Sequence, residues 1–286
     1  MLTRVDCIAL AVPDRRAAAA GWTALLGAEP AGERRSACLA ARCSRYRLGR
    51  GWIELLEPDG AGPVADAVAR RGGHLFAAGV ATDDLSGLVA RLRSQGVDPT
   101  LEDGQAHLDP ADSGIGLRAV LSPEAQLDPV GNVDFLYEIT LFSHDAAAAA
   151  GRCASLFGLD AAAFVPIESK QYAYAGTLTL FDRERLGRFE VITPNDPANT
   201  MGRFFTHVGE AFYMAFAESA ALAAIEERAR ERGDGFTAIP PDPRERRAAD
   251  TIFLHPPALG GMMLGLSRPT LAWQWSGHPE RVEAAL

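Results

Sequence analysis

The stretch Gly187-Arg188-Phe189-Glu190-Val191-Ile192-Thr193-Pro194 predicts a β-strand in which one acidic side chain lies among apolar residues, and which ends at a proline. The stretch Gly51-Trp52-Ile53-Glu54-Leu55-Leu56-Glu57-Pro58 has the same pattern. A carboxylate inside an apolar strand costs free energy unless it is paired, protonated or bound to something. Glu190 and Glu54 are therefore the first candidates for site residues.

Both strands belong to a repeated unit in which a strand is followed by a helix and then by further strands. A buried strand at Val5–Val12 precedes an Ala-rich helix at Arg15–Leu26, which Gly27 ends. The pattern restarts at Tyr137, where a second Ala-rich helix ends at Gly158. Shorter copies follow each of these, with strands and helices at His74–Ala81, Leu85–Gln95, Phe212–Ala217 and Ala220–Arg232. We count four copies, arranged as two pairs.

A segment rich in proline and polar residues, 122–132, lies near the middle of the chain and predicts a linker between domains. We expect an N-terminal pair of modules at 1–124 (modules about 1–60 and 72–121), a linker at 125–131, a C-terminal pair at 132–268 and a tail at 269–286. The tail contains Trp273 and Trp275, which either cap the second domain or form a dimer contact.

The composition favours a globular protein that binds a small molecule. The 286 residues are 48% hydrophobic and 23% charged, with a formal net charge of -9 and no long basic run. Nucleic acids and anionic membranes need a basic surface, so neither is an expected partner. We read no signal peptide and no transmembrane segment, which predicts a cytoplasmic protein. The four cysteines form no Cys-x-x-Cys pair and are expected to be buried thiols.

Several short segments, in their order and spacing, resemble the vicinal oxygen chelate superfamily. This superfamily includes glyoxalase I, methylmalonyl-CoA epimerase, bleomycin-resistance proteins and type I extradiol dioxygenases. The segments that carry the resemblance are Val5–Asp14 with Leu25-Leu26-Gly27, Ile53–Pro58, Ala81–Leu85, and Phe253–Pro256 with Gly260–Leu264. The resemblance implies an α+β fold of four βαβββ modules, paired into two cup-shaped mixed-sheet domains. We call the cup of the first pair the first cup and that of the second pair the second cup.

The resemblance also implies positions for a divalent metal, on the first strand and on the Glu-bearing or last strand of each module. Carried over to this chain, the first cup offers Cys7, Glu54, Ala77 and Ala119, and the second cup offers Glu138, Glu190, Tyr213 and Gly265. Neither set contains the histidine that a transition metal usually takes. The sequence therefore does not support the usual His-rich metal site of the family.

The second cup is expected to hold the active site, with Glu138, Glu190 and Tyr213 as catalytic residues. Two carboxylates facing each other in an apolar cavity would raise the pKa of one, which could then serve as acid or base, while Tyr213 donates a hydrogen bond to a substrate oxyanion. Alternatively, Glu138 and Glu190 hold a divalent metal (Mg, Mn or Fe), with His207 or His255 as a further ligand. In a third interpretation Glu138 points outward and Glu190 pairs with Arg188 or Arg203.

Further side chains are candidates for substrate binding. Lys170, Tyr172 and Tyr174 alternate along one predicted strand and would share a face, and His255 flanks the same cup. In the first cup, Glu54 has no obvious partner apart from Cys7, and this cup is expected to be mainly structural.

These features predict a catabolic enzyme of the glyoxalase/dioxygenase-like type that acts on an aromatic, dicarbonyl or enolisable acid by proton transfer or enolate stabilisation. Two alternatives remain open: a non-catalytic small-molecule binder of the bleomycin-resistance type, and a lyase or dioxygenase with an atypical metal site. Because module pairs of this superfamily often associate, a homodimer is also compatible with the sequence.

Overall fold

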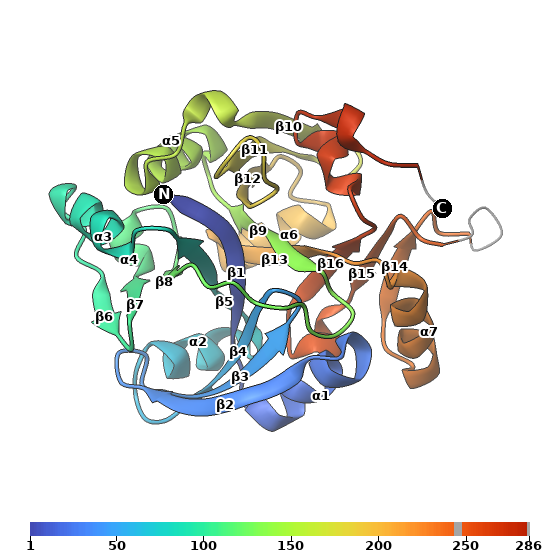
Figure 1. The fold of residues 1–286 in the computed structure, drawn as a ribbon, viewed down its shortest axis with the longest axis horizontal. Helices are drawn as coiled ribbons and strands as arrows, with labels where there is room; N and C mark the ends of the chain where they lie inside the picture. The colour runs from blue at the N-terminus through green and yellow to red at the C-terminus, as the bar shows by residue number, and fades with distance from the viewer. Residues whose placement is uncertain (243–247, 285–286) are drawn as a thin grey trace.

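The computed structural model describes residues 1–242 and 248–284, which form two mixed β-sheets of eight strands each (Figure 1). The strands of the first sheet are β1 (Leu2–Ala11), β2 (Glu29–Ser36), β3 (Ala41–Leu48), β4 (Gly51–Pro58), β5 (His74–Thr82), β6 (Thr100–Glu102), β7 (Gln105–Leu108) and β8 (Ala119–Pro123). Those of the second sheet are β9 (Phe135–Phe142), β10 (Val165–Ser169), β11 (Tyr174–Leu180), β12 (Arg188–Pro194), β13 (Ala211–Glu218), β14 (Phe236–Ile239), β15 (Thr251–Leu254) and β16 (Met263–Ser267).

The two sheets have the same topology. The first has the order β2-β3-β4-β1-β5-β8-β7-β6, and the second has the order β10-β11-β12-β9-β13-β16-β15-β14. In both, the first strand of one module runs parallel to the last strand of its own module and antiparallel to the first strand of the next. This is the predicted α+β arrangement of four modules in two pairs, and it is confirmed.

The helices pack against the sheets, and several of them begin and end at capping residues. They are α1 (Arg15–Leu26), α2 (Pro63–Arg71), α3 (Leu85–Ser94), α4 (Pro110–Ser113), α5 (Ala146–Phe157), α6 (Thr200–Val208) and α7 (Leu222–Arg232), with short 3-10 turns η1 (Ala161–Ala163), η3 (Pro256–Leu259), η4 (Leu271–Trp275) and η5 (Pro279–Arg281). The side chain of Asp14 accepts hydrogen bonds from two backbone N–H groups at the start of α1, and Gly27 ends the helix with a φ of 71°. At the start of α5, the side chain of Asp145 accepts one such hydrogen bond, from the backbone N–H of Ala148, and Gly158 ends that helix with a φ of 70°. None of the described helices is long and apolar enough to cross a membrane.

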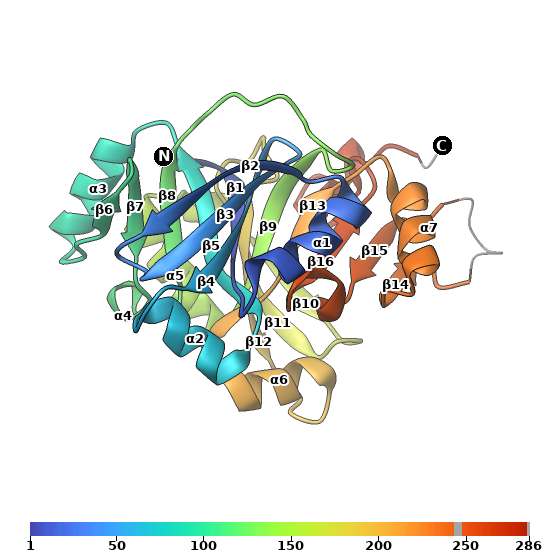
Figure 2. The same cartoon turned by 90° about the horizontal axis from the view of Figure 1, so that it is seen from below.

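The two module pairs share one apolar core. Strands β1 and β9, one from each sheet, lie side by side at the centre of the molecule (Figure 1), and a single buried cluster includes residues such as Trp22 and Leu259 from the two pairs. The segment between β8 and β9 has little regular structure and arches over the sheets (Figure 2). Helix α1 packs on η3 of the second pair so closely that a Cβ atom added to Gly21 would lie 1.7 Å from the carbonyl oxygen of Ala258.

The structure corrects several local predictions. Strands β2 and β3 are separated by a turn at 37–40, in which Ala40 has a φ of 48°, a break that the sequence pattern did not predict. Lys170, Tyr172 and Tyr174 were predicted to share one strand face. Lys170 and Tyr172 instead lie in the turn before β11, so this prediction is wrong. Strands β6, β7, β10 and β14 and helix α6 were not anticipated, because they are short and the strands contain exposed or polar residues.

Candidate active site in the second cup

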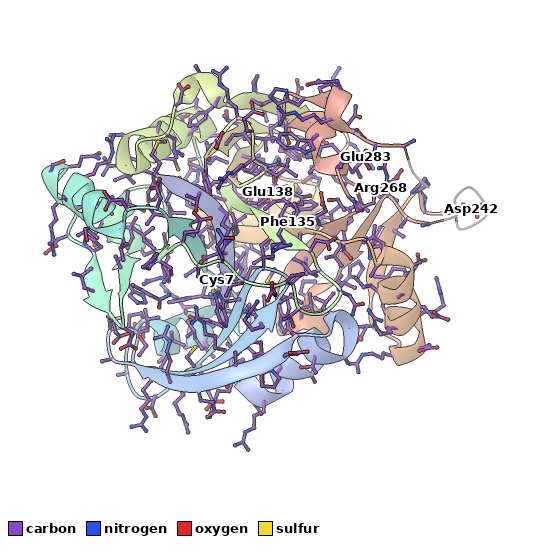
Figure 3. All side chains as sticks on the ribbon, viewed as in Figure 1. Cys7, Phe135, Glu138, Asp242, Arg268 and Glu283 are labelled. Carbon is purple, nitrogen blue, oxygen red and sulfur yellow. The ribbon has the colours of Figure 1, made fainter. Side chains whose placement is uncertain are left out.

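Glu190 lies at the centre of the second cup, where strands β12 and β9 run side by side. Their parallel register places Arg188 opposite Glu138 and Glu190 opposite Thr140, so that all four side chains share one face of the sheet. Figure 3 shows Glu138 near the middle of the molecule. The hydroxyl of Thr140 donates a hydrogen bond of 2.6 Å to Glu190 Oε2, and both residues are buried. Thr140 is thus a site residue that the sequence interpretation missed, although it follows Glu138 by two positions on the same strand.

We predicted that Glu138 and Glu190 face each other. In the structure Glu138 instead pairs with Arg188. The Arg188 Nε donates to Glu138 Oε2 at 2.5 Å, and the two side chains are 0% and 4% exposed. The Arg188 Nη1 also donates to the hydroxyl of Ser276 at 2.5 Å, and its guanidinium lies 5.0 Å from the centre of the Tyr137 ring. The prediction that Glu138 points outward is therefore wrong, as is the prediction that Glu190 pairs with Arg188 or Arg203.

The tail after β16 completes this buried cluster. Ala272 and Trp273 of η4 pack with Tyr137 and Phe216, while Ser276 holds Arg188. In this arrangement the tail covers the Arg188 end of the second cup, which agrees with a capping role for the residues beyond the last module.

Among the described residues, Glu190 forms a hydrogen bond with a hydroxyl group and no ion pair with a cationic side chain. Burial, together with the negative charge of Glu138, raises the pKa of Glu190 to about 8, although the Thr140 hydroxyl and the charge of Arg188 act in the opposite direction. The hydroxyl of Tyr174 also hydrogen-bonds to Glu190, and burial with the nearby carboxylate raises the pKa of Tyr174. A carboxyl group whose pKa lies near neutrality can both take up and release a proton under ordinary conditions.

Glu190 lines a cavity of about 370 Å³ in the second cup. A register shift between β13 and β9 allows two consecutive residues, Tyr213 and Met214, to line the cavity together. The remaining wall consists of aromatic, thioether, hydroxyl, amide and imidazole side chains: Gln171, Tyr172, Tyr174, Asn199, Thr200, Met201, Phe216, Thr237, Phe253, His255 and Met263. Among these described lining residues Glu190 is the one carboxylate, and there is no lysine or arginine.

The structure thus brings together five of the residues singled out from the sequence, which are Glu190, Tyr213, Tyr172, Tyr174 and His255. The ring of Tyr213 stacks on Phe142 with the centroids 4.6 Å apart, and burial raises its pKa, so its hydroxyl remains a donor. His255 Nε2 lies 3.0 Å from the Thr237 hydroxyl. Site residues that sequence reasoning missed include Met201 and Asn199, on and next to the unpredicted helix α6.

Two predicted residues lie elsewhere. Lys170 is exposed in the turn between β10 and β11 and does not line the cavity. His207 lies on α6 and lines a different cavity of about 460 Å³, together with Arg71 and Arg118. The structure therefore does not place His207 as a ligand beside Glu190.

The second cup does not fit the divalent metal that the fold family implies. A metal held by Glu138 and Glu190 would have to displace the buried guanidinium of Arg188, which already neutralises Glu138 at 2.5 Å. The described residues lining the cavity offer one carboxylate and one imidazole, and His255 is hydrogen-bonded to Thr237. Such a donor set is poorer than that of ordinary catalytic metal sites.

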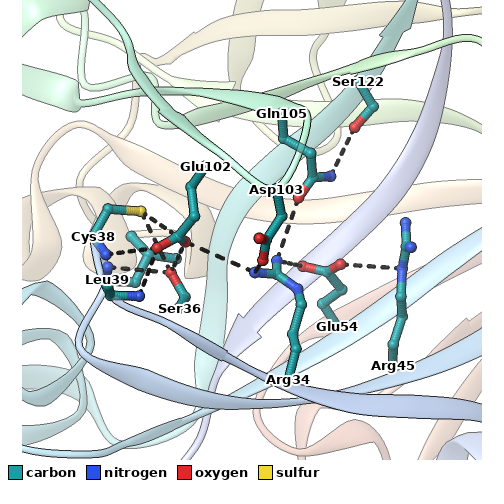
Figure 4. A network of polar contacts seen from close by, with 11 residues as sticks. Arg34, Ser36, Cys38, Leu39, Arg45, Glu54, Glu102, Asp103, Gln105 and Ser122 are labelled. Carbon is teal, nitrogen blue, oxygen red and sulfur yellow. Dashed lines mark hydrogen bonds and ion pairs between the residues drawn. The ribbon is translucent and has the colours of Figure 1, made fainter.

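The first cup neutralises its equivalent carboxylate differently. Glu54 is 2% exposed and forms ion pairs with Arg34 at 3.1 Å and Arg45 at 3.2 Å (Figure 4). The expectation that Glu54 has no partner apart from Cys7 is therefore wrong. Cys7 is buried on β1, and burial, with the charge of Glu54, raises its pKa well above the ordinary value, so the thiol is protonated. A mainly structural role for this cup stays a prediction.

Comparison with known proteins agrees with this architecture. Residues 6–113 match the family model described as the Glyoxalase/Bleomycin resistance protein/Dioxygenase superfamily. A triple mutant of 4-hydroxymandelate synthase from Streptomyces coelicolor is similar in structure, with a TM-score of 0.74 and 17% identity over 98% of this chain and 99% of that one. No curated protein sequence matches.

Methylmalonyl-CoA epimerases match a smaller part of the chain. A variant from Streptomyces coelicolor is 23% identical and covers 44% of this chain and 100% of its own, with a TM-score of 0.39. The enzyme from Mycobacterium tuberculosis is 18% identical over 48% of this chain and 89% of its own, also with a TM-score of 0.39. The predicted resemblance is confirmed, since residues 6–113 match the model of the Glyoxalase/Bleomycin resistance protein/Dioxygenase superfamily and the whole chain has the two-domain fold seen in the 4-hydroxymandelate synthase structure.

Proposed function

We propose that this protein is an enzyme that transfers a proton to and from a small aromatic or carbonyl-containing substrate, with Glu190 as the catalytic acid–base. One observation carries the proposal: Glu190 is a buried carboxyl group, bonded to neutral donors, whose pKa is raised to about 8 at the wall of a cavity of about 370 Å³. Perturbed carboxyl groups in concave apolar cavities are frequent at catalytic sites.

We assign separate tasks to the residues around the cavity. The ionised form of Glu190 removes a proton from the carbon next to a substrate carbonyl, and the hydroxyls of Thr140 and Tyr174 stabilise that carboxylate. Tyr213, which remains protonated, donates to the enolate oxygen that forms. The protonated Glu190 then returns its proton to the intermediate.

The pairing of Glu138 with Arg188 supports this assignment. Arg188 neutralises Glu138 in part, so the charge of Glu138 raises the pKa of Glu190 while the charge of Arg188 limits that rise. Arg188 and Glu138 do not line the cavity, so we give them a positioning role rather than contact with substrate. A direct catalytic role for Glu138 stays a prediction that this geometry does not favour.

The lining favours a substrate that is neutral or weakly charged. Rings of three tyrosines and two phenylalanines face the cavity with three methionines, a surface that suits an aromatic group. No lysine or arginine among the described lining residues is available to bind a carboxylate, and Lys170 lies outside. Among the predicted substrates, an aromatic ketone or a dicarbonyl compound therefore fits better than a strongly acidic one.

Replacing Glu190 tests the proposal. With a panel of enolisable aromatic ketones and dicarbonyl compounds, exchange of the α-hydrogen for deuterium should be catalysed by the wild-type protein and should increase as the pH passes through about 8. We expect Glu190→Gln to lower kcat/KM by about 10²- to 10⁴-fold, the usual contribution of a general base. Glu227→Gln, at an exposed position on α7, is the matched control and should retain activity.

The same panel separates the enzyme from a non-catalytic binder. Saturable binding of these compounds without any exchange or product would sink the enzymatic proposal and favour sequestration. Equal activity of Glu190→Gln and the wild-type protein would instead show that the catalytic group lies elsewhere.

A further inference from the structure

Three metal-ligating side chains meet at the rim of the first cup, away from the site described above. Cys38 lies in the turn between β2 and β3, Glu102 is the last residue of β6, and His107 lies on β7. One ligand atom from each lies within 4.8 Å of the others. The sequence has no zinc motif here because Cys38 is more than sixty residues from Glu102 and belongs to a different module.

Glu102 is held in place by the turn that contains Cys38. Its Oε1 accepts the backbone N–H groups of Ala37 at 2.6 Å and Cys38 at 3.1 Å, and its Oε2 accepts the hydroxyl of Ser36 at 2.5 Å (Figure 4). Burial opposes ionisation, but these hydrogen bonds lower the pKa of Glu102 to about 2. The carboxylate is therefore charged and fixed in orientation before any ligand arrives.

The thiol of Cys38 points at this carboxylate. Its Sγ donates to Glu102 Oε2 at 3.2 Å, and the residue is half-buried. Burial raises the pKa of Cys38, so without a ligand the sulfur keeps its proton. The Cys38 thiol and the Glu102 carboxylate are therefore already close together. A metal ion that binds here can displace the thiol proton, and the sulfur and a carboxylate oxygen then both coordinate the ion.

A buried ring nitrogen of His107 gives separate evidence for a ligand at this site. It is 8% exposed, and its Nε2 is buried without a hydrogen-bond partner among the described residues. Such an orphaned buried nitrogen costs free energy, which binding of a metal ion would recover. Burial also lowers the pKa of His107, so its ring is neutral and able to coordinate.

We propose that Cys38, Glu102 and His107 form a binding site for a borderline divalent cation of the Zn²⁺ type. Thiolate, imidazole and carboxylate are together the donors that Zn²⁺ prefers, and three protein ligands leave a fourth position for water. Binding releases one proton from Cys38, so that two negative ligands balance the charge of the ion. The nearby Arg34 lies 3.9 Å from Glu102 but is already paired with Glu54 at 3.1 Å and lies 3.7 Å from Asp103.

The site would tie the two modules of the first pair together. The turn between β2 and β3 belongs to one module, and the β6–β7 hairpin belongs to the other, at the far edges of the same sheet. These edge strands have few neighbours, so a metal at this point would fasten the rim of the first cup. Its role is structural and independent of proton transfer at Glu190.

Metal titration of the full chain tests the proposal. After chelation and dialysis, Zn²⁺ alone should bind at one ion per chain and raise the melting temperature, and Co²⁺ in its place should give a thiolate-to-metal charge-transfer band. Cys38→Ser and His107→Gln should each weaken Zn²⁺ binding by at least about 100-fold, because removal even of outer partners of a ligand costs 10- to 100-fold. Cys153→Ala, which removes a buried thiol on α5, is the control and should bind normally.

The ligands can also be identified without any variant, by X-ray absorption of the Zn²⁺-loaded wild-type protein. One sulfur with nitrogen or oxygen neighbours supports the site. A shell without sulfur, the absence of stoichiometric binding, or unchanged affinity in both Cys38→Ser and His107→Gln would each overturn it.

Discussion

At the scale of single residues, Glu190 and Glu54 occupy the same position in two copies of one module but have different partners. Glu54 is charge-balanced by Arg34 and Arg45, whereas Glu190 receives hydrogen bonds from neutral hydroxyl groups. Hydroxyl donors stabilise a carboxylate less than a guanidinium does, which leaves the desolvation of Glu190 only partly offset. Of these two carboxyl groups, Glu190 is therefore the one whose protonation can change near neutral pH.

This difference predicts how stability depends on pH. Since the pKa of Glu190 is about 8 in the folded protein and 4.5 ordinarily, the folded state holds a proton that the unfolded state releases between these values. The free energy of unfolding should therefore fall as the pH rises from about 4.5 to about 8. Glu190→Gln removes this loss, so denaturant unfolding at pH 5 and pH 9 should show a smaller decrease for the variant. Parallel losses in both proteins would contradict the raised pKa.

The sequence predicted Glu190 because an acidic residue interrupts an apolar strand, and that signal does not depend on tertiary structure. It could not predict that Arg188 binds Glu138, because this contact depends on the register between β12 and β9, which are separated by a helix and two further strands. Tyr172 was predicted to line the cavity for an incorrect reason, since it reaches the cavity from a turn.

At the scale of elements, the buried pair of Arg188 and Glu138 links β12 to β9 in the middle of the second sheet. Arg188→Met would leave the Glu138 carboxylate buried without a counter-charge, and we expect it to lower the free energy of unfolding by about 3–5 kcal/mol. The double variant Arg188→Met/Glu138→Leu should recover most of this loss, because two apolar side chains replace the pair. Urea denaturation of the single and double variants measures the coupling. A loss below about 1 kcal/mol in Arg188→Met would show that Glu138 finds another partner or takes up a proton.

Long elements were easier to predict than short ones. The observed bounds of α1 are those predicted, because Asp14 and Gly27 mark both ends and the helix buries an apolar face. Strand β10, in which half-buried and exposed residues alternate, and the three-residue β6 lie at sheet edges, where little hydrophobic pattern is required. The residues of the proposed metal cluster lie next to β2 and on β6 and β7, at the two edges of the first sheet. Sequence periodicity therefore did not predict that they meet.

At the scale of the whole molecule, the two module pairs share an apolar core and also meet in a close contact between α1 and the backbone of η3. Gly21→Ala would place a methyl group on the carbonyl oxygen of Ala258 and should destabilise the protein by at least about 2 kcal/mol. Gly151→Ala makes the same change at an exposed position of α5, where no atom lies within 4 Å, and should stabilise it by about 0.5–1 kcal/mol. Thermal denaturation compares the two. The same sign for both variants would mean that α1 can move away from η3.

The guanidinium of Arg188 has one more consequence, which concerns the supply of cations. The positive charge beside Glu138 is that of a side chain, so neither dialysis nor a chelator can remove it. A shortage of metal ions would also leave this charge in place. Treatment with a chelator should therefore leave turnover at Glu190 unchanged while it lowers the melting temperature by emptying the Cys38 cluster. A loss of activity that follows the loss of metal, measured on the same sample, would show that the two cups are not independent.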